Sequence, residues 1–166
     1  VLPEPQGATG PKVVWRDAES AEDEGRWVAD DVLRLIDRGA NPATIAVLSN
    51  DKETRLLMRE CLEKRGVPTS WYESGSNNAL VDLDHPSVKV LTIASAKGLE
   101  FPVVFVPAVT EHLFPSKDND SERADKARRL LYTAMTRAGR QLFVSATRSE
   151  QSQLWSELEL TFLEGG

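Results

Sequence analysis

The chain of 166 residues, 40% of them hydrophobic, is long enough to bury the core of one domain. Its single cysteine excludes a disulfide or a cysteine-based metal site within the chain, and no apolar run approaches the roughly 20 residues of a membrane-spanning helix, which together fit a protein of the reducing cytoplasm. The net charge of −6 argues against a freestanding protein that binds DNA tightly without sequence preference, because such proteins usually have a broad basic face.

Strand and helix patterns alternate along residues 12–163, which we interpret as one domain, whereas residues 1–11, rich in Pro and Gly, are interpreted as a linker or an expression remnant. Ser20 is the expected cap of the first helix. The near-continuous apolar strands indicate an α/β three-layer sandwich, in which helices cover both faces of a mostly parallel sheet. The predicted elements are strands over 12–15, 45–48, 69–72, 88–93, 103–106 and 142–145, helices over 20–39, 52–65 and 122–136, and a last amphipathic helix with Leu154, Trp155, Leu158 and Phe162.

The second predicted helix has an apolar stripe that we expect to face the core. Its members are Leu56, Leu57, Cys61 and Leu62. Cys61 is interpreted as a small core residue, because it lies among apolar neighbours. No metal site is expected anywhere in the chain.

The third helix and the strand after it are basic, in contrast to the chain as a whole. Residues 122–148 hold seven bases and two acids, a net charge of +5, whereas residues 1–31 have a net charge of −5. Arg137 falls on the apolar stripe of this helix, three residues after Ala134, whereas Arg140 falls on a polar stripe. A cation on a buried stripe must reach a cleft or an anionic partner, because its burial alone costs several kcal/mol. Arg137 is therefore the strongest candidate for a functional residue.

Two motifs, about 30 residues apart, give the chain a family resemblance. The first is Thr92-Ile-Ala-Ser-Ala-Lys97-Gly98-Leu99-Glu100-Phe101, and the second is Tyr132-Thr-Ala-Met-Thr136-Arg137-Ala138. They resemble motifs V (T-x-H-x-x-K-G-L-E-F) and VI (Y-x-x-x-T-R-A) of the UvrD/Rep group, a family of superfamily 1 DNA translocases. The resemblance implies a C-terminal RecA-like lobe, called 2A. Only 15 residues separate Tyr72 from Val88, where larger relatives carry an inserted 2B subdomain, so we expect a compact member without 2B.

The resemblance implies roles in nucleotide binding for four residues. Arg137 would be an arginine finger that reaches ATP held by another lobe. Glu100 would accept a hydrogen bond from the ribose, and Gly98 would let the turn approach a ligand or a neighbouring strand closely. Lys97 would contact a phosphate of the nucleotide or of DNA. The alternatives are that Arg137 is a structural residue that pairs with a buried carboxylate or caps the helix end, that Glu100 is a solvated acid, and that Lys97 balances a local acid.

Short polar side chains are the expected contacts to DNA. Thr92 and Ser95 could hold backbone phosphates without reading the sequence. Asn50 follows the strand over 45–48, which is a weaker match to the family's A-V-L-Y-R-x-N segment. In that segment Ser49 and Asn50 replace the Tyr-Arg pair, and in motif V Ala94 replaces the histidine and so removes a donor.

The residues that cradle ATP in such motors are missing from the sequence. It contains no G-x-x-x-x-G-K-[ST] phosphate loop and no Asp-Glu magnesium pair of the family kind. We therefore expect ATP and Mg²⁺ to be held mainly by an N-terminal lobe of the same polypeptide, with single-stranded DNA as the other partner and no membrane. The chain would be the C-terminal motor lobe of an ATP-dependent DNA helicase or translocase, inactive in isolation. The alternative is a degenerate, non-catalytic lobe that binds protein or nucleic acid.

Overall fold

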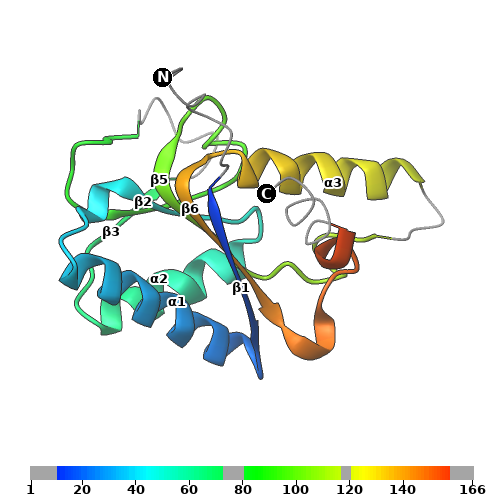
Figure 1. The fold of residues 1–166 in the computed structure, drawn as a ribbon, viewed down its shortest axis with the longest axis horizontal. Coiled ribbons are helices and arrows are strands. Elements are labelled where there is room, and N and C mark those ends of the chain that lie inside the picture. Colours follow the sequence, from blue (N-terminus) through cyan, green and yellow to red (C-terminus); the bar gives the residue numbers. More distant parts are fainter. Residues whose placement is uncertain (1–10, 73–80, 117–120, 158–166) are drawn as a thin grey trace, which may run out of the picture.

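The computed structural model describes residues 11–72, 81–116 and 121–157. Its six strands form one all-parallel sheet in the order β1-β6-β5-β2-β4-β3 (Figure 1). The strands are β1 Lys12–Ala18, β2 Ile45–Leu48, β3 Thr69–Tyr72, β4 Val88–Leu91, β5 Phe101–Val106 and β6 Ala138–Thr147. The helices are α1 Ala21–Asp37, α2 Lys52–Lys64 and α3 Ser121–Met135, with 3-10 turns η1 Pro42–Thr44 and η2 Arg148–Glu150.

Helices cover both faces of the sheet, so the α/β sandwich predicted from the sequence is confirmed (Figure 1). Alternate side chains of β2 explain why its apolar run is continuous. Ile45 and Val47 pack on the face covered by α1 and α2, while Ala46 and Leu48 pack on the face covered by α3. Burial on both faces accounts for the exclusion of water from all four residues of β2 and of β4.

The second helix is rotated relative to the prediction. Leu56 is 46% exposed, so its assignment to the core is wrong, and Leu57 and Cys61 are only half-buried. The buried stripe consists of Arg55, Met58 and Leu62. An arginine can occupy it because Arg55 Nη1 donates to Ser49 O at 2.8 Å and the guanidinium stacks on the Trp71 ring at 5.1 Å.

Four of the described strands have different bounds from those predicted: β5 begins at Phe101 instead of residue 103, and β1, β4 and β6 also differ. β1 extends past Trp15 to Ala18, and β6 begins at Ala138 and ends at Thr147, so that seven residue pairs join the two strands. Arg16 binds both carboxylate oxygens of Asp31 on α1, which lets a charged residue sit in a strand beside the core. The strand predicted over 88–93 ends at Leu91 instead.

The ends of the domain are only partly described. Ser20 caps α1 as predicted, since its Oγ accepts from Asp23 N at 3.1 Å. Leu154 and Trp155 are buried in a helical turn after η2, while Leu158, Phe162 and most of the 1–11 segment lie outside the described residues. In the described part of the chain, no helix has the length and apolar character needed to cross a membrane.

Candidate functional site

The segment 92–100, which carries the first motif, runs from the edge of the sheet formed by the carboxyl ends of the strands to the opposite edge, formed by their amino ends. We call these the carboxyl edge and the amino edge. The segment leaves the carboxyl end of β4 and enters the amino end of β5, and these ends lie at opposite edges because the strands are parallel. Ile93 and Ala96 are buried in the core beneath α3, so the segment is anchored along its path. The predicted DNA contacts therefore lie at the carboxyl edge, and Glu100 and Arg137 at the amino edge.

At the carboxyl edge the structure brings Asn50, Thr92 and Ser95 together. Asn50 Oδ1 accepts from Ile93 N at 2.8 Å, which ties the turn after β2 to the turn after β4. Thr92 is buried, and its hydroxyl donates to Ser95 Oγ at 2.8 Å and accepts from Ser95 N at 3.0 Å. The hydroxyl proton of Thr92 is thus used within the turn, and the amide N–H groups of Asn50 and the hydroxyl of Ser95 are the better donors to a ligand.

At the amino edge Arg137 lies in the two-residue turn between α3, which ends at Met135, and β6, which begins at Ala138. The guanidinium is half-buried and makes three hydrogen bonds to neutral acceptors: Nε to Thr133 O at 3.2 Å, Nη1 to Leu99 O at 3.4 Å and Nη2 to Thr136 Oγ1 at 3.3 Å. The bond to Thr133 O caps the helix end, as the structural alternative anticipated. No carboxylate pairs with Arg137 among the described residues, so its charge remains available to an anion.

Glu100 lies beside this arginine. The backbone groups on either side of it bind Arg137: Leu99 O accepts from the guanidinium, and Phe101 N donates to Arg137 O at 2.9 Å. The Glu100 side chain is exposed, as is that of Lys97. The sequence identified these side chains, but it did not show that the backbone of the first motif holds the arginine of the second.

Gly98 adopts a backbone conformation that favours glycine, and its expected close approach to a ligand stays a prediction. Its φ is +82°, in the left-handed region that glycine adopts at little cost. A Cβ added there would meet no described atom within 4 Å, so no neighbouring strand approaches it. Within the described structure the positive φ is the feature that requires a glycine here.

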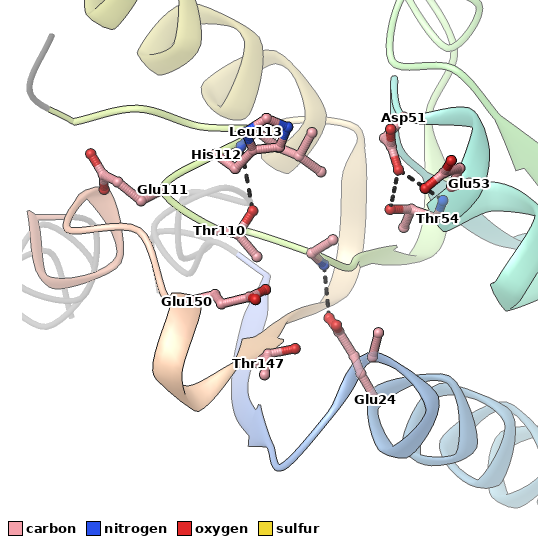
Figure 2. A pocket seen from close by; sticks show the side chains of 12 residues that line it. Glu24, Asp51, Glu53, Thr54, Thr110, Glu111, His112, Leu113, Thr147 and Glu150 are labelled. Atoms are coloured by element: carbon pink, nitrogen blue, oxygen red, sulfur yellow. Dashed lines mark hydrogen bonds between the residues drawn. The ribbon is translucent and has the colours of Figure 1, made fainter.

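A pocket of about 480 Å³ at the carboxyl edge was not anticipated from the sequence (Figure 2). It is assembled from the beginnings of α1 and α2, the loop after β5 and the segment after β6. Its acidic lining residues are Glu24, Asp51, Glu53, Glu111 and Glu150. Such a concentration of carboxylates repels phosphate, so this pocket itself is unsuited to a phosphate group. The only sequence signal was the acidic first turn of α1, which is also explained by the helix dipole.

Glu24 is the buried acid of this pocket, with 2% of its surface exposed. Its Oε1 accepts from Ala108 N at 2.7 Å, the bond drawn from Glu24 in Figure 2. The same oxygen accepts from Ser145 Oγ at 2.6 Å. Ala108 has a φ of 56°, which is unfavourable for a residue with a Cβ. Burial raises the pKa of the Glu24 carboxyl, and the two hydrogen bonds oppose this effect. Glu24 therefore holds the strained turn after β5, and burial of its ionised form has a free-energy cost that the protonated form avoids.

Replacing Glu24 should change stability in two distinguishable ways. Glu24→Ala leaves two buried donors unsatisfied and should lower the free energy of unfolding by about 1–3 kcal/mol. Glu24→Gln keeps an acceptor for both donors but cannot ionise. The pKa of Glu24 in the folded protein is raised above the ordinary 4.5. The free energy of unfolding of the parent therefore falls as the pH rises through this folded pKa. Denaturant unfolding should thus show the free energy of unfolding of Glu24→Gln rising relative to that of the parent from about pH 4.5 upward. A difference between the two that does not change with pH would contradict the assignment. Glu22→Ala, at an exposed position in the same turn, is the control.

Comparisons with known proteins converge on one family. Residues 74–149 match the model of the UvrD-like helicase C-terminal domain. The chain is similar to DNA helicase II of Rickettsia typhi, with 40% identity over 76 residues that make up 43% of this chain and 11% of that protein. It is also similar to the ATP-dependent DNA helicase srs2 of Schizosaccharomyces pombe, with 30% identity over 127 residues, 76% of this chain and 13% of that protein. The chain thus spans about a tenth of the length of these curated relatives.

Solved structures agree with the sequence comparisons. The crystal structure of the C-terminal domain of a possible DNA helicase from Lactobacillus plantarum WCFS1 aligns with a TM-score of 0.62 and 25% identity, covering 87% of this chain and 77% of that one. The C-terminal domain of the DEAD-box protein Dbp5 aligns with a TM-score of 0.57 over 95% of this chain and 86% of that one, and at 14% identity this shows a shared fold. The RecA-like fold predicted from the sequence is confirmed.

Proposed function

Because this chain carries the C-terminal lobe of a UvrD-like superfamily 1 helicase, we propose that it is the second motor lobe of an ATP-dependent DNA helicase or translocase. In this role it supplies an arginine finger and part of the track for single-stranded DNA. The observation that carries the proposal is Arg137, a half-buried cation held only by neutral acceptors in the described structure. For localisation we propose the reducing cytoplasm, because the chain has a single cysteine and so forms no disulfide within itself.

The donor set at the amino edge fits ATP as the ligand. Arg137 has five N–H donors, of which three are used by described acceptors, so two remain for phosphate oxygens. Lys97 adds a second cation, and the exposed carboxylate of Glu100 suits a ribose hydroxyl. Bound ATP would supply the free energy for movement, and with Mg²⁺ it would be held mainly by an N-terminal lobe of the same polypeptide.

Arg137 would act by stabilising negative charge that develops on the transferred phosphoryl group. A guanidinium stays protonated and presents a planar fork, so it can meet two phosphate oxygens at once. Thr133 O, Leu99 O and Thr136 Oγ1 hold the group in position before the lobes close, which lowers the cost of ordering it at the moment of reaction.

DNA would lie at the opposite edge of the sheet. Asn50 and Ser95 offer neutral donors that suit backbone phosphates, with Thr92 shaping the turn that presents them. The segment 92–100 joins this edge to Arg137. Repeated closing and opening of the lobes around ATP would then move the strand along the lobe surfaces.

Binding of single-stranded DNA to the 166-residue chain should be weak and sensitive to salt. The described contacts at the track are neutral, and the net positive charge is confined to residues 122–148. We expect a Kd in the micromolar range or weaker, and, if about three phosphates are contacted, an affinity that falls about 20-fold between about 50 and 200 mM salt. Titration of a labelled oligonucleotide tests this. Nanomolar binding at the higher salt would reveal an independent binding surface instead.

A further inference from the structure

Helix α2 buries an arginine on the stripe that faces the core. Arg55 is 4% exposed and lies beside Met58 and Leu62, the other two buried residues of this helix. Burying a cation is costly even where it forms hydrogen bonds, and an apolar side chain of similar volume often fills such a site at no loss of stability. Neither the proposed arginine finger nor the DNA contacts considered so far use Arg55. A costly residue of this kind indicates a role beyond filling the core.

The guanidinium of Arg55 holds the turn that follows β2. Its Nη1 donates to Ser49 O at 2.8 Å, and Ser49 is only 3% exposed, so water hardly reaches this part of the turn. A buried carbonyl that loses its donor costs free energy, which ties the position of the turn to the arginine. The Trp71 ring on β3 lies 5.1 Å from the guanidinium and limits its movement. One contact is therefore fixed by side chains and backbone from three elements of the sheet layer.

Hydrogen bonds on both sides of Asn50 restrict the backbone of this turn. Before Asn50, Ser49 O is held by Arg55; after it, Asp51 N donates to Ser49 Oγ at 3.1 Å. Asp51 is fixed further because its side chain caps α2. The Asn50 side chain is exposed, and its Oδ1 accepts from Ile93 N at 2.8 Å. The turn therefore offers the amide N–H groups of Asn50 to a ligand from a backbone that is already ordered.

We propose that Arg55 is a positioning residue for DNA: it fixes the carbonyl of Ser49 and so holds the Asn50 amide where it meets a backbone phosphate of the single strand. The inference rests on the proposed DNA track, in which Asn50 contacts the strand, and adds the residue that orders this contact in advance. A donor held in its bound geometry binds more tightly, because less freedom is lost when the ligand arrives. Arg55 itself does not touch the strand, since its guanidinium is buried against the Trp71 ring.

Arg55→Met tests the inference, because the apolar side chain suits the buried stripe but leaves Ser49 O without the donor that Arg55 supplies. In fluorescence-anisotropy titrations of labelled oligodeoxythymidylate at low salt, this variant should bind about three- to tenfold more weakly than the parent, the effect of one hydrogen bond. Arg55→Gln, which also lacks the guanidinium, should give the same loss. Arg55→Lys keeps a donor for Ser49 O and should bind within about twofold of the parent.

Arg59→Met is the matched control for these titrations. It makes the same substitution one turn further along α2, where the Arg59 guanidinium lies 5.8 Å from the same Trp71 ring. Arg59 Nε pairs with Glu63 at 2.9 Å, so this arginine takes part in the packing around Trp71 without bonding to the turn. The variant should bind oligodeoxythymidylate within about twofold of the parent, as expected of a partly exposed position away from the contact.

Asn50→Ala separates positioning from a purely structural role and from failure of the track. Because Arg55 acts through Asn50, the double variant with Arg55→Met should bind no more weakly than Asn50→Ala alone. Additive losses, an unchanged affinity of Arg55→Met, or failure of both Arg55→Met and Arg55→Gln to fold overturns the role of Arg55 and leaves the track intact. An unchanged affinity of Asn50→Ala, or no binding by the parent, overturns the track at Asn50 and this inference with it.

Discussion

Replacing Arg137 by alanine in the complete motor is expected to lower the rate of ATP hydrolysis by about 10³- to 10⁵-fold, or roughly 4–7 kcal/mol of barrier. The affinity for ATP should change little, because a group that meets the phosphate only when the lobes close stabilises the transition state more than the bound substrate. Steady-state turnover and nucleotide titration on the same preparations measure the two quantities.

Arg140→Ala is the matched control for this experiment. It removes the same charge three residues further along, from an exposed side chain at the start of β6, and should leave turnover nearly unchanged. A rate for Arg137→Ala within about threefold of the parent, less than roughly 1 kcal/mol, would show that Arg137 is no arginine finger. Its bond to Thr133 O also caps α3, so thermal melts of both variants are needed. An unfolded Arg137→Ala would assign the residue to the fold.

The 166-residue chain by itself is expected to hydrolyse no ATP above background, with or without DNA. It has no phosphate loop and no Asp-Glu magnesium pair of the family kind, so neither the phosphates nor the metal would be held. The chain should nevertheless fold, because both faces of its sheet are covered, and should melt in one step. Phosphate release measured with and without oligodeoxythymidylate tests the first part. DNA-stimulated hydrolysis would contradict the interpretation of this chain as one lobe.

The order of strands and helices could be predicted because each apolar run is local. The burial of Arg55 in place of Leu56 could not, because it depends on Ser49 O and on the Trp71 ring, which belong to other elements. The full length of β1 likewise depends on Asp31, 15 residues from Arg16. Periodicity describes which residues share a face, whereas such long-range partners decide which face is turned inward.

The candidate site could likewise be predicted from the sequence only in part. Two motifs were sufficient to select Arg137, Glu100 and Lys97 and to identify the fold. They could not show that Thr92 and Glu100 lie at opposite edges, since this follows from the parallel pairing of β4 and β5 with β2 between them. The pocket at the carboxyl edge was also missed, because it is built from segments with no common pattern in the sequence.

The link between β4 and β5 is short and is held at both edges of the sheet. Most connections between parallel strands contain a helix and a dozen or more residues, but here nine residues, 92–100, make the crossing. The link is fastened at one end by Asn50 to Ile93 N and at the other by Leu99 O to the guanidinium, with Ala96 buried between. A displacement of the turn at Asn50 is therefore expected to shift the backbone that holds the Arg137 guanidinium at the opposite edge.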